Sequence, residues 1–122
     1  MNVFSSLDLN TIALLLDVDG TLIDIGPSPD SVHVSGELRE SLGRLAQLTG
    51  GAVALVSGRL IADLDRMFAP LKLPAIGAHG AQMRIAGGDV QQVVRSLPNS
   101  LRLLLAPAAV SGVVVEDKGS SV

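Results

Sequence analysis

The chain has 122 residues, of which 48% are hydrophobic and 2% aromatic, and its formal net charge at pH 7 is −3. It contains no cysteine, which excludes a disulfide framework, a thiolate zinc site and a cysteine nucleophile. The acidic balance argues against a general nucleic-acid or anionic-membrane surface. The composition therefore predicts one ordered domain with an aliphatic core, and more apolar surface than so short a chain buries easily.

No segment has the pattern of a membrane span or a secretion signal. Residues 1–10 lack a basic region, and the apolar run that follows is interrupted by Asp17. That run is far shorter than the roughly 20 residues that a membrane-spanning helix needs. We therefore expect a cytoplasmic protein with no nucleic-acid partner and no membrane partner.

The first two-thirds of the chain alternate short apolar runs with amphipathic patterns. Uniformly apolar runs are typical of strands in a parallel sheet, and leucines at spacings of three and four indicate helices. Right-handed crossovers between such strands produce an α/β fold. We expect strands over 11–16, 52–56 and 74–78, and helices over 36–49 and 60–68.

The last third of the chain is less regular. A glycine-rich turn predicts a β-hairpin, and a Leu- and Ala-rich stretch limited by two prolines predicts a helix. A β-branched run then leads into a cluster of charged residues. We expect the hairpin over 82–85 and 90–94, the helix within 97–110 and the β-branched run over 113–116.

Three polar clusters follow directly after predicted strands. They are Asp17-Val18-Asp19-Gly20-Thr21, Ser57-Gly58-Arg59 and His79-Gly80. Ligands of parallel sheets bind at the carboxyl ends of the strands. We therefore expect the three clusters to converge on one site at that edge of the sheet.

The first cluster has the clearest chemistry. Two carboxylates close together after a buried strand repel each other, and a divalent cation removes that cost. Mg²⁺ prefers oxygen ligands and is typically held by one or two carboxylates and a substrate phosphate. Gly20 permits a tight turn whose amides can face an anion. The alternative interpretation is a polar turn that ends the strand and caps a helix.

The other clusters are ambiguous by themselves. Ser57 and Gly58 at the start of a helix form a phosphate site or a simple helix cap. His79 beside glycine is a catalytic group or a turn residue. The charged cluster from Glu116 to Lys118 binds a polar ligand or is a solvated face.

Taken together, the motifs resemble those of one superfamily and of one family within it. Asp17-Val18-Asp19-Gly20-Thr21-Leu22 with Val56-Ser57-Gly58-Arg59 resembles the haloacid-dehalogenase-like (HAD) phosphatases. Gly77-Ala78-His79-Gly80 with Arg84, and above all Val115-Glu116-Asp117-Lys118-Gly119, resembles the trehalose-6-phosphate phosphatases. The resemblance extends from about Leu14 to the end of the chain.

The resemblance implies a role for each matching residue. Asp17 would be the nucleophile that forms an aspartyl-phosphate, Asp19 the general acid and base, and both would hold Mg²⁺. The substrate would be a small sugar phosphate. The phosphate-binding residues would be Gly20, Thr21, Ser57 and Gly58, and the substrate-binding residues would be Arg59, His79, Gly80, Glu116 and Lys118.

The resemblance also implies a two-part architecture. Residues 1–96 would be the amino-terminal part of a HAD-like core, a parallel sheet with helices on both faces. Residues 97–122 would begin an inserted, mobile α/β cap that closes over the site. Because later core strands would be absent, the strand over 11–16 would be an exposed apolar edge that pairs or aggregates.

Two motifs of the family are not in the sequence. These are the lysine that clamps the phosphate and a Gly-Asp-Asp-type motif, since the only lysines are Lys72 and Lys118. We therefore expect an amino-terminal fragment that is inactive alone. The alternatives are a phosphatase for sucrose 6-phosphate or mannosyl-phosphoglycerate, and a non-catalytic truncated fragment.

Overall fold

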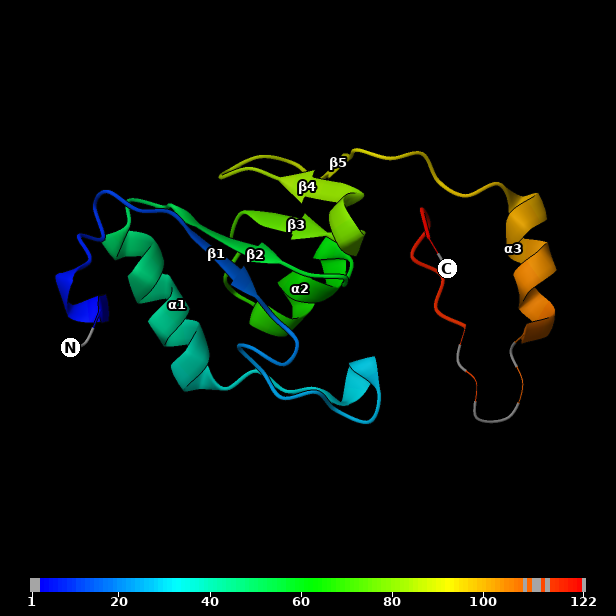
Figure 1. Ribbon diagram of the computed structural model, residues 1–122, viewed down its shortest axis with the longest axis horizontal. Coiled ribbons are helices and arrows are strands. Elements are labelled where there is room, and N and C mark those ends of the chain that lie inside the picture. Colours follow the sequence, from blue (N-terminus) through cyan, green and yellow to red (C-terminus); the bar gives the residue numbers. More distant parts are fainter. Residues whose placement is uncertain (1–2, 109, 111–112, 114, 122) are drawn as a thin grey trace.

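The chain folds around a twisted sheet with two helices beneath it, as the computed structural model shows (Figure 1). The structure describes residues 3–108, 110, 113 and 115–121. The strands of the described residues are β1 (Leu14–Asp17), β2 (Val53–Val56), β3 (Ala75–Gly77), β4 (Gln82–Arg84) and β5 (Gln91–Gln92). Their helices are α1 (Gly36–Leu48), α2 (Ile61–Phe68) and α3 (Asn99–Leu105), with short 3₁₀ turns at Val3–Ser6, Pro29–Ser31, Ala78–Gly80 and Ala106–Ala108.

The described strands form one sheet in the order β1-β2-β3-β4-β5. β1, β2 and β3 are parallel, whereas β3, β4 and β5 are antiparallel. The parallel crossovers and the hairpin were both expected. The first strand begins three residues later than the apolar run predicts, and it includes Asp17, which lies opposite Val56 of β2.

The boundaries of α1 follow from side-chain capping. The Ser35 hydroxyl accepts a hydrogen bond from the Leu38 amide at 3.1 Å, which satisfies a free donor of the first turn. At the other end, the Thr49 hydroxyl donates to the Leu45 carbonyl at 2.8 Å. Gly50 and Gly51 both have positive φ and end the helix, as their sequence predicts.

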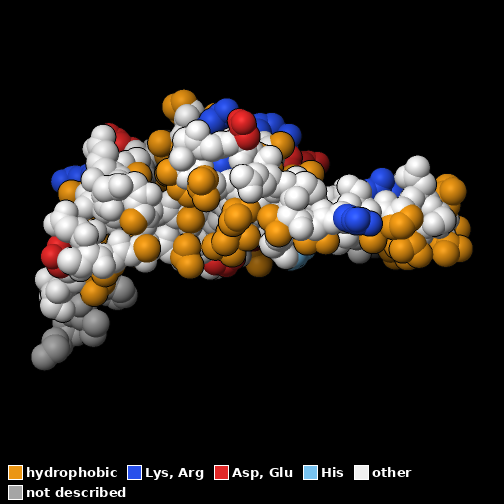
Figure 2. Space-filling model, turned by 90° about the horizontal axis from the view of Figure 1, so that it is seen from above, with side chains coloured by type: hydrophobic (Ala, Val, Ile, Leu, Met, Phe, Trp, Pro, Cys, Tyr) orange, Lys and Arg blue, Asp and Glu red, His pale blue; other side chains and the backbone are white. Residues whose placement is uncertain are grey.

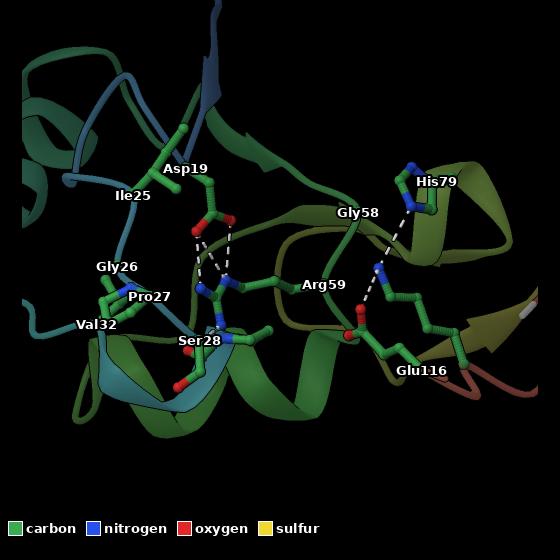
Figure 3. A pocket seen from close by; sticks show the side chains of 12 residues that line it. Asp19, Ile25, Gly26, Pro27, Ser28, Val32, Gly58, Arg59, His79 and Glu116 are labelled. Atoms are coloured by element: carbon green, nitrogen blue, oxygen red, sulfur yellow. Dashed lines mark hydrogen bonds and ion pairs between the residues drawn. The ribbon is translucent and has the colours of Figure 1, made fainter. Parts of the chain in front are cut away.

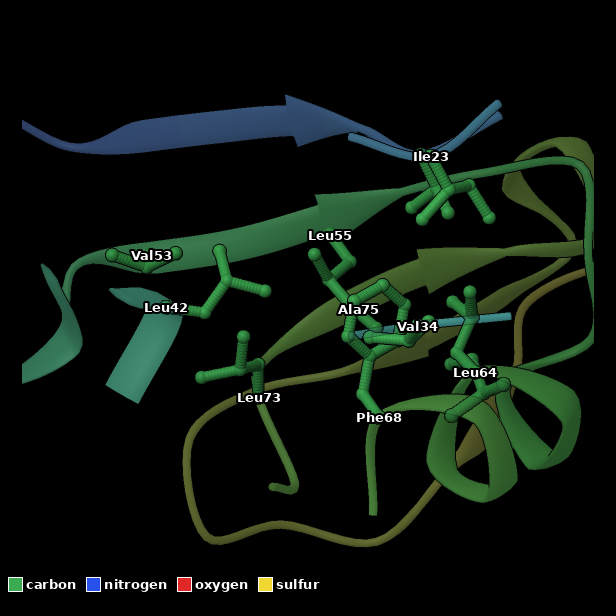
Figure 4. Close-up of a cluster of buried hydrophobic side chains, with 11 residues drawn as sticks. Ile23, Val34, Leu42, Val53, Leu55, Leu64, Phe68, Leu73 and Ala75 are labelled. Carbon is green, nitrogen blue, oxygen red and sulfur yellow. The ribbon is translucent and has the colours of Figure 1, made fainter. Parts of the chain in front are cut away.

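The core lies between the sheet and both long helices (Figure 4). Leu42 of α1 and Leu64 and Phe68 of α2 are fully buried and belong to one cluster with Val53 and Leu55 of β2. Two successive right-handed crossovers in one direction place their helices on the same face of a sheet. The expectation of helices on both faces is therefore not met within the described residues.

The opposite face of the sheet is apolar and uncovered in the described part of the chain. Leu15 in β1 is 68% exposed, and Met83 and Ile85 near β4 are also exposed. In Figure 2, hydrophobic side chains are spread over the surface of the sheet and its helices, and they gather at the end of the molecule formed by α3. β1 is an edge strand that pairs only with β2 among the described strands, so the expected exposed edge is confirmed. Its pairing with a partner stays a prediction.

The helix expected within 97–110 is present as α3, and the two prolines limit it as predicted. Pro98 occupies the position before α3, and α3 gives way to a 3₁₀ turn around Pro107. Positions 113, 115 and 116 of the β-branched run are not in a strand, and position 114 lies outside the described residues. The carbonyl of Gly119 accepts from the Leu97 amide at 2.7 Å and from Arg102 Nη2 at 2.6 Å. These bonds fold 97–119 back on itself, whereas a domain boundary at residue 97 stays a prediction.

Within the described residues, no helix has both the length and the hydrophobicity required to span a bilayer.

Gly77 is predicted to be essential for the packing of β3 against α2. A Cβ atom at this position would lie 2.8 Å from the Arg59 carbonyl oxygen and 2.7 Å from Ile61 Cγ1. We expect Gly77→Ala to lower the free energy of unfolding by about 1–3 kcal/mol, as overpacking does. Urea denaturation followed by circular dichroism measures this change.

Gly36 provides the matched control, since a Cβ atom there would meet no heavy atom within 4 Å. Gly36→Ala should leave the stability unchanged or raise it by up to about 1 kcal/mol. Equal denaturation midpoints for Gly77→Ala and the wild-type chain would contradict the packing described here.

Candidate active site

The ends of the three parallel strands bring the three polar clusters together. Asp17 closes β1, Ser57 follows β2, and the 3₁₀ turn Ala78–Gly80 follows β3. The Ala78 amide donates to the Arg59 carbonyl at 2.7 Å and the His79 amide to the Ser57 carbonyl at 3.4 Å. The predicted convergence at the carboxyl edge of the sheet is confirmed.

Asp17 lies at the surface with its carboxylate held in one orientation. The Thr21 hydroxyl donates to Asp17 Oδ2 at 2.7 Å. The turn that places Thr21 depends on Gly20, whose φ is +79° and whose amide donates to the Ile23 carbonyl at 2.8 Å. Among the described residues, no Lys, Arg or His nitrogen forms an ion pair with Asp17. Its negative charge is therefore available to a ligand.

Asp19 is bound by a forked guanidinium. Arg59 Nε donates to Asp19 Oδ2 at 2.9 Å, and Arg59 Nη2 donates to Oδ1 at 2.7 Å. Such two-pronged, charge-assisted pairs fix geometry as well as charge. Hydrogen bonding from Arg59 lowers the pKa of the Asp19 carboxyl below its ordinary value, against the opposing effect of burial. Asp19 is therefore ionised at neutral pH in this arrangement.

Arg59 also reaches a loop for which the sequence suggested no function. Its Nη1 donates to the Pro29 carbonyl at 2.9 Å, and Pro29 begins the short 3₁₀ turn after β1. The loop around this turn contributes Ile25, Pro27 and Val32 to the wall of the site. The two prolines close together, which restrict the backbone, were the sequence signal that could have indicated an ordered wall.

A cleft of about 380 Å³ opens between this loop, the strand ends and the C-terminal segment (Figure 3). Glu116 enters it on the side away from Asp19, as Figure 3 shows, and Lys118 also lines the cleft. The Lys118 ammonium lies 3.6 Å from Glu116 Oε2 and 3.3 Å from His79 Nε2. The cleft therefore contains fixed positive and negative groups on both sides.

The structure places the predicted site residues in two groups. One group lines the cleft and consists of Asp19, Gly58, Arg59, His79, Glu116 and Lys118. The other lies at or beside the strand ends without lining it and consists of Asp17, Gly20, Thr21, Ser57 and Gly80.

Ser57 illustrates how the second group is held. It is 7% exposed, and its hydroxyl accepts from the Arg59 amide at 3.0 Å. Its hydroxyl is thus engaged with the backbone of the turn, whereas the N-cap residue of α2 is Leu60. The catalytic and binding roles of both groups remain predictions.

The donor atoms near Asp17 fit a hard cation only in part. Within the described residues, no three His, Cys, Asp or Glu side chains gather into a metal site. The Asp17 carboxylate and the main-chain carbonyl of Asp19 are oxygen donors of the kind Mg²⁺ prefers, and water and substrate phosphate commonly complete its shell. The chemistry of these two donors suits Mg²⁺, and their role as its ligands stays a prediction.

Comparison with known proteins places this chain in a family. The family model for trehalose-phosphatase matches residues 15–122. The chain belongs to the trehalose-phosphatase family. It is 41% identical over 120 residues to a probable trehalose-phosphate phosphatase of Sinorhizobium fredii and 37% identical over 113 residues to the trehalose-6-phosphate phosphatase of Escherichia coli. It covers 45% and 42% of those two proteins, while they align with 96% and 88% of this chain.

Solved structures confirm the HAD-like fold. A trehalose-6-phosphate phosphatase related protein superposes with a TM-score of 0.71 over 88% of this chain and 48% of its own, at 23% identity. A haloacid dehalogenase-like hydrolase from Bacillus subtilis superposes with a TM-score of 0.55 over 79% of this chain and 32% of its own, at 26% identity. The fold and family expected from the motifs are thus confirmed.

Arg59 is predicted to control the ionisation of Asp19. In Arg59→Met the guanidinium is lost, so we expect the pKa of the Asp19 carboxyl to rise toward its ordinary value. Carboxyl ¹³C shifts followed by NMR through an acid titration in metal-free buffer measure this pKa directly.

Arg66→Met is the matched control for this titration. Arg66 pairs with Asp63 at 2.8 Å on the exposed side of α2 and has no bond to Asp19. The pKa of Asp19 should be the same in Arg66→Met as in the wild-type chain. If Arg59→Met also leaves it unchanged, the forked pair does not govern Asp19.

Proposed function

We propose that the protein of which this chain forms part is a Mg²⁺-dependent phosphatase that hydrolyses trehalose 6-phosphate to trehalose and phosphate. The observation that carries the proposal is the juxtaposition of Asp17 and Asp19 with a cleft lined by Glu116 and Lys118, in a chain of the trehalose-phosphatase family. One side of this arrangement supplies carboxylates for phosphoryl transfer. The other supplies charged groups that can bind sugar hydroxyls.

In the first step, a carboxylate oxygen of Asp17 attacks phosphorus. The bond between phosphorus and the sugar oxygen breaks as the bond to Asp17 forms, and Asp19 gives its proton to the departing sugar oxygen. The hydrogen bond from Thr21 to Asp17 Oδ2 holds the carboxylate in one rotamer. The other oxygen, Oδ1, is then the one free to attack.

In the second step, water hydrolyses the aspartyl-phosphate. Asp19 now removes a proton from the water as it attacks phosphorus, and the bond between phosphorus and Asp17 breaks. The enzyme returns to its starting protonation state with phosphate released. This covalent route divides one difficult reaction into two easier ones.

Proton donation requires that Asp19 be free of its tight pair with Arg59 when the substrate is bound. The pair favours the ionised carboxylate, as the lowered pKa of Asp19 indicates. An anionic phosphate in the cleft offers the guanidinium a second partner, because Arg binds phosphate through the same fork that it uses for carboxylates. We propose that substrate binding shifts Arg59 toward the phosphate and releases Asp19 for protonation.

Mg²⁺ would be held by the Asp17 carboxylate and the Asp19 main-chain carbonyl, and when bound it would supply charge neutralisation for the phosphoryl group. Ser57, Gly58, Gly20 and Thr21 would complete phosphate binding through hydroxyl and amide donors. Arg59, His79, Gly80, Glu116 and Lys118 would contact the substrate. The cytoplasm, where sugar phosphates are made and consumed, is the proposed location.

Asp17 is predicted to be indispensable for phosphate release. The full-length protein should release phosphate from trehalose 6-phosphate in the presence of Mg²⁺, and Asp17→Asn should abolish turnover because it removes the nucleophile. Asp19→Asn should lower kcat by about 10²–10⁴-fold, as loss of a general acid and base does. Malachite green detection of phosphate measures both effects.

The exposed Asp89, which lies in the loop between β4 and β5, is the matched acid-to-amide control. Asp89→Asn should retain wild-type turnover. In Asp19→Asn, slow hydrolysis should let phosphorylated Asp17 accumulate, which mass spectrometry detects after an acid quench. The absence of phosphorylated Asp17 in a variant that still turns over would contradict the covalent route.

A substrate panel separates the remaining alternatives. Preferred release from sucrose 6-phosphate or mannosyl-phosphoglycerate would replace the trehalose assignment and keep the mechanism. A folded full-length protein that releases phosphate from none of the three esters would favour a non-catalytic role.

A further inference from the structure

The His79 ring is seated on a position that only glycine can occupy. A Cβ atom added to Gly58 would lie 2.4 Å from His79 Cε1 and 2.7 Å from Nε2. The imidazole therefore packs closely against the backbone that follows β2. His79 is exposed, and it lines the cleft together with Glu116 (Figure 3).

The backbone that presents His79 is strained. Ala78 and His79 both have positive φ, at 49° and 54°, which is unfavourable for residues with a Cβ atom. The Ala78 amide, which donates to the Arg59 carbonyl at 2.7 Å, holds this pair in place. Strained residues persist where the surrounding structure fixes them, and such positions cluster at functional sites.

The contact between Lys118 and His79 selects one tautomer of the neutral ring. The distance from Lys118 Nζ to His79 Nε2 is 3.3 Å. An ammonium can only donate, so Nε2 must accept and the proton of the neutral ring must be on Nδ1. Lys118 is thereby held between His79 and Glu116, and its side chain is only 15% exposed.

We propose that His79 is a positioning residue for Lys118. The neutral ring, seated on Gly58, holds the ammonium of the C-terminal segment at the mouth of the cleft. Lys118 then faces the bound ligand from a fixed point without contact between His79 and the reacting atoms. The proposal rests on the proposed function for its ligand, a sugar phosphate whose hydroxyls Lys118 would bind.

The first test needs no substrate. The ring nitrogens of His79 and His33 can be assigned by substitution of each histidine in a long-range ¹H–¹⁵N NMR spectrum of the full-length protein. In mildly alkaline buffer, His79 should show the Nδ1–H tautomer, and Lys118→Met should shift it toward the Nε2–H form. His33 should be the same in both spectra and serves as an internal control. An unchanged His79 tautomer in Lys118→Met would overturn the proposal.

The second test measures coupling during substrate binding. His79→Ala and Lys118→Met should each raise KM for trehalose 6-phosphate by about tenfold, and the double variant should raise it little further, since residues that act together are not additive. His79→Asn should rescue much of the loss, because Asn tolerates positive φ and its side-chain oxygen can accept from Lys118. Additive effects on KM, or a failure of Asn to rescue where His79→Ala is folded, would contradict the positioning role.

The two tests separate the proposals. If no sugar phosphate is hydrolysed, the proposed function fails while the tautomer measurement still decides the role of His79. If hydrolysis is normal and the His79 tautomer is the same in Lys118→Met as in the wild-type protein, the positioning role fails while the proposed function stands.

Discussion

The forked pair between Arg59 and Asp19 is the interaction on which the rest of the site depends. One guanidinium uses Nε and Nη2 for the carboxylate after β1 and Nη1 for the Pro29 carbonyl in the loop beyond it. The backbone of the same residue accepts from Ala78 after β3. Three strand ends and one loop are thus joined through a single residue. A change at Arg59 therefore alters the wall of the cleft as well as the charge of Asp19.

The same pair imposes a chemical constraint. A carboxylate that donates a proton must first acquire one, yet the pair with Arg59 stabilises its ionised form. Under the proposed mechanism, the arrangement described here is a resting one, and the substrate would compete with Asp19 for the guanidinium. The cost of that competition would be offset by new contacts to phosphate. This use of binding energy is a general feature of catalysis.

Local patterns in the sequence predicted most of the backbone. Uniform apolar runs indicated the three parallel strands, and Ser35 with Gly50 and Gly51 predicted both ends of α1. These signals depend only on residues that are close together in the sequence. The late start of β1 was not predictable in this way, because the strand begins only where β2 offers a partner, at Leu14 opposite Val53. The single layer of helices follows from two crossovers that run in the same direction across the sheet. That direction depends on the order of the strands in the sheet, which no single stretch of sequence reveals.

Long-range side-chain pairs were the least predictable part of the site. The sequence grouped Asp17, Asp19 and Ser57 correctly at one edge, because strand ends meet by topology. It suggested no bond between Arg59 and Asp19, which are 40 residues apart, and none between His79 and Lys118. Nothing in the sequence indicated that the Gln82 side chain accepts from the Ile61 amide, at 3.0 Å, at the start of α2. Such contacts depend on where each side chain points and on residues far away in the sequence, and neither can be inferred from a local pattern.

The carbonyl of Gly119, which accepts from both Leu97 and Arg102, makes the segment 97–119 a loop closed upon itself. Both of these bonds lie within the segment itself. Among the described residues, the hydrogen bond from Lys118 to His79 is the side-chain bond that joins this loop to the sheet. A hydrogen bond from a charged donor contributes about 1.5–3 kcal/mol. A ligand that contacts both Lys118 and the strand ends would therefore add a second link between the C-terminal segment and the sheet.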